Sequence, residues 1–133
     1  APITYRDQQF GDIDALLDAS GIDFATVGTW VGVGGTVTSL SALAQGLATY
    51  DRARVHGSVI THGELEELGL RLLAMPVAAV TQLPTMVPGR ADVICCGALI
   101  ARRVASRLAP ELTVSEADIL DGLVLGLVRS VQL

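Results

Sequence analysis

Three glycines within four positions constrain this chain more than any other feature. Gly32, Gly34 and Gly35 lie between strand-forming residues (Thr29–Val33) and a segment that begins a helix at Thr36. A glycine has no Cβ, so the turn can adopt positive φ and let another group approach closely. The helix that follows points its unpaired N–H groups and the positive end of its dipole at the same space. The pattern predicts either an anion site, most often for phosphate, or a tight turn without a ligand.

The composition is unusually apolar for a chain of 133 residues, which is the length of one domain. Half of the residues are hydrophobic, 17% are charged, and the mean hydropathy is +0.52. The longest apolar runs, such as Val93–Ala101, are far shorter than the ~20 residues that span a bilayer. No basic-then-apolar leader is present, so we expect a cytoplasmic chain. The excess apolar surface predicts self-association into a homo-oligomer or a missing part that covers it.

The charge balance and the cysteines exclude several classes of site. The net charge of −5 argues against general nucleic-acid binding. All basic residues are arginines, which suit bidentate phosphate contacts, whereas a P-loop would need a lysine. The glycine turn lacks the third glycine and the acidic residue of a dinucleotide fingerprint. Cys95 and Cys96 are adjacent, so we expect small core residues rather than a disulfide or a metal site.

Hydrophobic periodicity predicts an α/β chain with about five helices and two strands. Two parallel strands do not form a stable sheet alone, so the chain is expected to be part of a larger α/β layer. The helix at 90–108 should be the longest, with a first half that is buried all round. The expected elements are helices at 12–19, 36–48, 61–75, 90–108 and from 115 onward, one further turn at 78–83, and strands at 27–33 and 112–114.

Two histidines and three glutamates allow a functional and a structural interpretation. His56 is expected to be a hydrogen-bonding loop residue, and His62 to be exposed at the start of a helix. No cluster of Cys, Asp or Glu completes a metal-ligand set around them. Glu64, Glu66 and Glu67 resemble a carboxylate cluster, but helical spacing distributes them around a solvated face.

Arg90 and Asp92 stand at the entry to the helix expected at 90–108. A carboxylate is favoured there by the helix dipole, so a structural Arg90–Asp92 clasp and a ligand role are both open. No set of nucleophile, base and orienting group is apparent in the sequence. The chain alone therefore does not have the residues of a complete enzyme.

Four motifs follow one another in the order found in a known protein family. They are Gly32–Leu40, Tyr50–Gly57, Pro88–Ile94 and Ser115–Gly122. Over about Trp30–Leu127 this order resembles the exopolyphosphatase / guanosine pentaphosphate phosphohydrolase (Ppx/GppA) family. The resemblance implies an actin-like (ribonuclease H-like) ATPase fold, in which two α/β lobes flank a phosphate cleft. It also implies that residues 1–133 are the later part of the second lobe, without the N-terminal lobe.

The resemblance implies that this chain supplies one wall of the phosphate cleft. Its glycine turn matches the superfamily turn that faces the nucleotide or phosphate. No residue of this chain is expected to be catalytic or to bind a metal. The implied phosphate- or nucleotide-binding residues are Gly34, Gly35, Thr36 and Thr38, with His56, Arg90 and Asp92 as loop support.

The chain also departs from the family. The catalytic glutamate, both phosphate loops and the Mg²⁺ ligands that accompany those loops have no counterpart here. Ile119–Gly122 replaces a family ending of the Gly-Leu-Arg-Glu-Gly type.

We therefore expect a truncated part of a phosphohydrolase. The intact enzyme would use Mg²⁺ and release terminal phosphate from inorganic polyphosphate or guanosine penta/tetraphosphate. Two alternatives stay open. One is a non-catalytic module that senses polyphosphate or a nucleotide or serves assembly, and the other is a sugar-kinase-like ATPase lobe.

Overall fold

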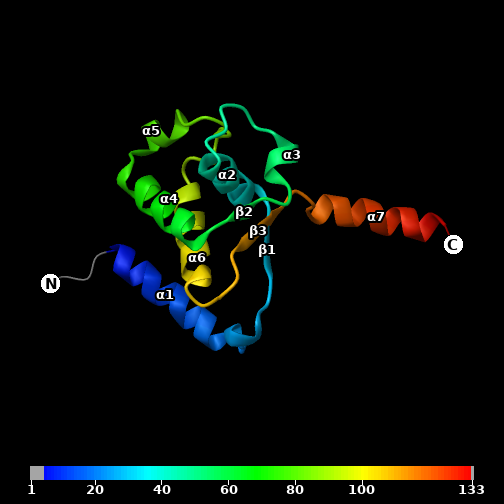
Figure 1. Ribbon diagram of the computed structural model, residues 1–133, viewed down its shortest axis with the longest axis horizontal. Helices are drawn as coiled ribbons and strands as arrows, with labels where there is room; N and C mark the ends of the chain where they lie inside the picture. Colours follow the sequence, from blue (N-terminus) through cyan, green and yellow to red (C-terminus); the bar gives the residue numbers. More distant parts are fainter. Residues whose placement is uncertain (1–4, 133) are drawn as a thin grey trace.

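The computed structural model describes residues 5–132 as an α/β body from which the last helix projects (Figure 1). Within this part of the chain, no helix is both long and apolar enough to cross a membrane. In chain order the elements are α1 (Tyr5–Ala19), the 3-10 helix η1 (Phe24–Thr26), β1 (Trp30–Val33), α2 (Gly35–Ala44), α3 (Arg52–Val55), β2 (Val59–Ile60), α4 (His62–Ala74), α5 (Val77–Thr81), α6 (Ile94–Ala105), β3 (Leu112–Ser115) and α7 (Ile119–Val131).

The sheet has three strands in the order β1–β3–β2. β1 runs parallel to β3, with Trp30 opposite Leu112, and β2 runs antiparallel to β3, with Ile60 opposite Leu112 from the other side. The two predicted strands, β1 and β3, are present and parallel, but the sheet also has a third strand, β2, that was not predicted. The sequence analysis missed β2 because a strand of two residues is too short to produce an alternating pattern.

Local sequence signals place some helix ends correctly and others not. Thr61 and Glu64 form the predicted capping box: the Glu64 N–H donates to Thr61 Oγ1 at 3.1 Å, and the Thr61 N–H donates to Glu64 Oε2 at 2.8 Å. By contrast, α6 begins at Ile94 rather than at residue 90. With 12 residues it is shorter than α1, which has 15. The last helix begins after Asp118 rather than at Ser115, because Ser115 still belongs to β3.

The core lies where α2, α4 and α6 pack together and against the sheet. Only part of the α6 surface faces this core: Ala98 is fully buried, whereas Ile100 is about half exposed. The expectation of a first half buried all round is therefore wrong. The prediction that both cysteines are core residues is also wrong, since Cys95 is only partly buried and Cys96 is exposed. The largest fully buried side chains are Leu40, Ile60, Leu65, Leu72, Ile94 and Leu112.

Candidate phosphate site at the start of α2

The glycine turn between β1 and α2 has the strand–turn–helix geometry that the sequence predicts. Gly34 caps α2 with φ 93° and ψ 171°, a conformation that residues with a side chain rarely adopt. The Thr38 N–H donates to the Gly34 carbonyl at 3.2 Å, which is the first turn of helical bonding. The N–H groups that precede Thr38 have no partner within the helix, and they open toward the end of β1.

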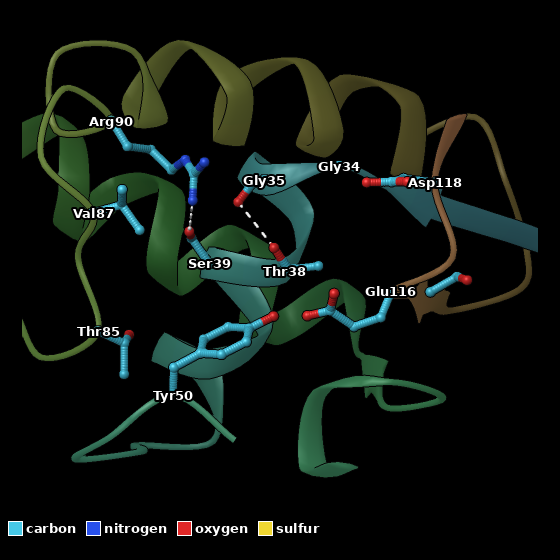
Figure 2. Close-up of a pocket in the computed structure, with 11 residues that line it drawn as sticks. Gly34, Gly35, Thr38, Ser39, Tyr50, Thr85, Val87, Arg90, Glu116 and Asp118 are labelled. Carbon is cyan, nitrogen blue, oxygen red and sulfur yellow. Dashed lines mark hydrogen bonds between the residues drawn. The ribbon is translucent and has the colours of Figure 1, made fainter. Parts of the chain in front are cut away.

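The Arg90 guanidinium lies across the first turn of α2 (Figure 2). Its Nη1 donates to Ser39 Oγ at 3.1 Å. A Cβ built on Gly35 would lie 2.5 Å from Arg90 Cζ, so any side chain at this position would displace the guanidinium. The expected Arg90–Asp92 clasp is not formed. Since residues 90–93 are turns before α6, Arg90 reaches over to α2 while Asp92 is exposed to solvent.

A cavity of about 390 Å³ opens beside these groups. The ends of both parallel strands reach it, β1 through the glycine turn and β3 through Ser115 and Glu116. Ligand sites of α/β proteins commonly lie at this carboxyl edge of the sheet. The lining residues are Gly34, Gly35, Thr38, Ser39, Tyr50, Thr85, Val87, Arg90, Ser115, Glu116 and Asp118 (Figure 2).

Two carboxylates border the cavity on the side of β3. Asp118 Oδ1 accepts the N–H groups of Leu120 at 2.9 Å and Asp121 at 3.2 Å, so this carboxylate caps α7. The Glu116 carboxylate points toward the Tyr50 hydroxyl (Figure 2). Among the side chains of residues 10–132, no group of three or more His, Cys, Asp or Glu is placed to hold a metal ion.

The structure brings some of the predicted site residues together and separates others. Thr36 turns its side chain toward α6, where its methyl group packs against Gly97, so only its backbone faces the turn. Asp92 is exposed and does not line the cavity. The predicted residues that do line it are Gly34, Gly35, Thr38 and Arg90.

His56 behaves as the sequence predicts and His62 does not. His56 Nδ1 accepts the Glu116 N–H at 3.0 Å, so this loop histidine fixes the chain that follows β3. It thereby supports the cavity without lining it. His62 was expected to be simply exposed, but its Nε2 lies 3.0 Å from the Pro110 carbonyl and links α4 to the loop before β3.

The three glutamates of α4 have different roles. Glu64 completes the capping box, and Glu67 is exposed, as expected for a solvated face. Glu66 instead accepts two hydrogen bonds from Arg102, with Oε1 at 2.6 Å from Nη2. This contact spans 36 positions of sequence, so helical spacing alone could not predict it.

Sequence reasoning missed several residues that line the cavity. Ser39 could have been found, because it lies one helical turn after Gly35 on the same face of α2. Thr85 carries no such signal. It has φ 66°, an uncommon conformation for a β-branched residue, and its Oγ1 is buried without a hydrogen-bond partner among the described residues. Tyr50 and Glu116 join the site only through the folding of distant segments.

Comparison with known proteins identifies the family. A model of the Ppx/GppA phosphatase family matches residues 4–131. The chain belongs to this family. It is 46% identical over 104 residues to "Exopolyphosphatase 2" of Mycobacterium tuberculosis, a match that covers 74% of this chain and 33% of that protein. The chain therefore spans about a third of the length of this curated relative.

Solved structures agree with this assignment. A crystal structure of an exopolyphosphatase-like protein superposes with a TM-score of 0.86 at 30% identity, over 95% of this chain and 43% of that one. A Ppx/GppA family member from Aquifex aeolicus superposes with a TM-score of 0.83 at 26% identity, over 92% of this chain and 40% of that one. The resemblance drawn from the four sequence motifs and the predicted α/β, actin-like fold are both confirmed.

Proposed function

We propose that this Ppx/GppA chain forms one wall of the cleft of a phosphohydrolase. The enzyme would release terminal phosphate from inorganic polyphosphate or from guanosine penta/tetraphosphate. Membership of the family and the similarity to a protein named exopolyphosphatase support this reaction class. In this proposal the chain is the later part of a second lobe, and a first lobe would supply the opposite wall.

The convergence of two positive groups on one cavity carries the proposal. The start of α2 contributes unpaired N–H groups and the positive end of a helix dipole. The Arg90 guanidinium, held by Ser39, lies across the same turn. Guanidinium groups bind phosphate oxygens through paired hydrogen bonds. The space beside Gly34 is open, and Gly35 makes room for the Arg90 guanidinium, so a phosphate can approach both the backbone at Gly34 and this charge.

In this proposal the groups that carry out hydrolysis belong to the first lobe and not to the described residues. Of the two carboxylates that border the cavity, Asp118 caps α7 and Glu116 points toward the Tyr50 hydroxyl (Figure 2). The described residues also hold no cluster that fits Mg²⁺. In this proposal this wall binds and orients the phosphate chain, and the opposite wall supplies the activation of the attacking water and any Mg²⁺.

A Gly35→Val variant tests the position of the site. A side chain at residue 35 would displace Arg90 and fill the space above the turn, so we expect loss of short-chain polyphosphate binding with the fold retained. Gly28→Val is the matched control, because a Cβ at residue 28 meets nothing within 4 Å. Binding would be followed by backbone-amide NMR titration with and without Mg²⁺. In the unaltered chain the shifts should concentrate at Gly34, Gly35 and Thr36.

Unchanged binding by Gly35→Val would remove the phosphate site from this turn. An absence of shifts in the unaltered chain would argue for the alternative function, a structural or assembly module. Arg90→Gln removes the guanidinium charge and leaves the N-terminus of α2 intact, so it measures the two contributions separately. It should weaken binding about tenfold, the loss of one charge-assisted contact, without introducing bulk at the turn.

We also propose that the protein self-associates, an assembly role that the surface of α7 favours. Its apolar side chains are exposed along the whole helix. In an antiparallel pair of these helices, Asp121 near the start of one would oppose Arg129 near the end of the other. We expect light scattering at tens of micromolar to show a dimer or larger species. A clean monomer would contradict this proposal.

A further inference from the structure

A second cavity begins where the candidate phosphate cavity ends. Tyr50 lines both, so the two cavities meet at this residue. The second has a volume of about 530 Å³ and lies between the end of α2 and the short helix α3. Its lining includes two arginines, Arg52 and Arg54, and one acidic residue, Asp51.

The backbone that carries these arginines is fixed in place. Asp51 caps α3, with Oδ1 accepting the Ala53 N–H at 3.0 Å. Gln45 Nε2 donates to the Arg54 carbonyl at 2.9 Å, which ties α3 to the end of α2. The Asp51 carboxylate is therefore occupied by the backbone, and the two guanidinium groups outweigh its charge.

The arginines of the two cavities differ from those of α6. The arginine ion pairs recorded among residues 10–132 engage Arg102 and Arg103 of α6, and Arg107 just after it, and engage none of Arg52, Arg54 or Arg90. In a chain of net charge −5 that has no lysine, available positive charge is scarce. Its presence along two adjoining cavities points to an extended anion rather than a compact one.

We propose that Arg52 and Arg54 form a second anion subsite, which holds the continuing part of a linear polyphosphate whose end occupies the first cavity. This inference rests on the proposed phosphate site. A linear polyphosphate carries charge on every unit, so it can bind guanidinium groups at several points along its length. A ligand of two or three phosphates fills the first cavity only. The subsite thus makes affinity depend on chain length.

The test compares a short and a long ligand on the full chain. Binding of tripolyphosphate and of polyphosphate with several tens of units would be measured by calorimetry over a range of salt concentrations. The variant is Arg52→Gln/Arg54→Gln. Arg71→Gln removes a charge from the exposed face of α4, lines neither cavity, and is the control. Arg52→Lys/Arg54→Lys keeps the charge but loses the bidentate geometry.

We expect the glutamine variant to bind long polyphosphate about tenfold more weakly and tripolyphosphate as before. For the long ligand, the slope of the logarithm of affinity against the logarithm of salt concentration should fall in magnitude by about 2, one for each lost phosphate contact. In the lysine variant, which keeps both charges, this slope should be largely retained. Equal loss for both ligands, or no loss for either, would overturn the subsite. If the unaltered chain binds neither ligand, the proposed function itself fails, and this inference fails with it.

Circular dichroism of each variant distinguishes a binding effect from a folding effect. Basic side chains near helix ends also stabilise the helix dipole, so a structural role for these arginines is the rival explanation. In that case the glutamine variant would melt earlier and lose affinity for both ligands together. A selective loss of the long ligand at unchanged melting temperature supports the subsite.

Discussion

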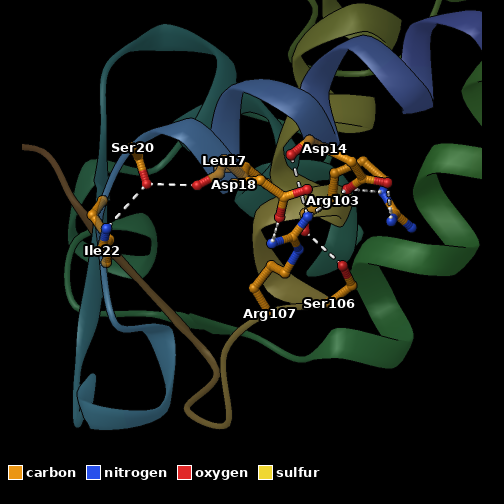
Figure 3. A network of polar contacts seen from close by, with 8 residues as sticks. All are labelled: Asp14, Leu17, Asp18, Ser20, Ile22, Arg103, Ser106 and Arg107. Carbon is orange, nitrogen blue, oxygen red and sulfur yellow. Dashed lines mark hydrogen bonds and ion pairs between the residues drawn. The ribbon is translucent and has the colours of Figure 1, made fainter.

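Helix α1 is held against the body by charged groups, whereas helix α7 exposes an apolar surface and projects away from the body (Figure 1). Asp14 bonds to Arg103 at 2.6 Å and to Arg107 at 3.3 Å, and Asp18 bonds to Arg107 at 2.6 Å (Figure 3). On α7, large side chains are between 47% and 84% exposed: Ile119, Leu120, Leu123, Val124, Leu125, Leu127, Val128 and Val131.

The difference between these helices shows that hydrophobic content alone does not decide which segment packs. The second half of α6 offers arginines that match the acidic face of α1. The guanidinium groups of Arg102 and Arg103 also lie near the Phe10 ring of α1, at 5.6 Å and 5.2 Å from its centre. Among the described residues α7 meets no surface of matching shape. We expect the attachment of α1 to respond to pH and salt, and the exposure of α7 to respond to protein concentration.

The largest expected effect comes from comparing a core leucine with one on α7. Leu40 is fully buried, so Leu40→Ala should lower the free energy of unfolding by about 2–5 kcal/mol. Leu123 is 59% exposed, and Leu123→Ala should change it by at most about 0.5 kcal/mol in dilute solution. Urea unfolding at low protein concentration measures both. An equally large loss for Leu123→Ala would mean that α7 is packed in solution.

Association through α7 is the next effect in size. Replacing Leu123 and Leu127 with Asp removes two apolar side chains from the proposed contact, each worth about 1.5 kcal/mol or more when buried. We expect the association constant to fall at least about 100-fold, measured by analytical ultracentrifugation. The control is Leu16→Asp, because Leu16 is similarly exposed on α1. Equal loss in the control would place the contact elsewhere.

Release of α1 is a smaller effect. Arg103→Gln breaks a bidentate pair with Asp14 that is only partly buried, so we expect a loss of about 1 kcal/mol. Hydrogen exchange at residues 10–19 should accelerate, and added salt should accelerate it in the unaltered protein too. Arg71→Gln, on the outer face of α4, provides the comparison. Unaltered exchange in Arg103→Gln would show that apolar contacts hold α1.

The smallest effect is the response of α1 to acid. Hydrogen bonding from Arg103, opposed in part by desolvation, holds the pKa of Asp14 below its ordinary value. A carboxyl whose pKa is lower in the folded state contributes stability above its unfolded pKa of about 3.9 and loses it as pH falls through the folded value. The protection factors at residues 10–19, which are corrected for the intrinsic pH dependence of amide exchange, should therefore be constant from pH 7 to 5 and fall below about pH 4. Asp14→Asn should lack this acid-dependent step.

Features that depend on neighbouring residues were predictable from the sequence. The glycine turn and the capping box at Thr61 follow from backbone hydrogen bonding and steric rules that act over a few positions. The order of the four motifs was sufficient to indicate the Ppx/GppA family. The strand ends and the start of α6 were less accurate, because hydrophobic runs do not mark where hydrogen bonding begins.

The tertiary structure decided the contacts between distant segments. Arg90 and Ser39 are 51 positions apart in the sequence. Arg90 bonds to Ser39 rather than to the expected partner Asp92, because the turn before α6 directs the arginine over α2. β2 forms because β3 offers it an open edge, not because its own two residues favour a strand. The apolar pattern of α7 determined that it is a helix with a surface to cover. Whether that surface is covered depends on a complementary partner, which local sequence does not encode.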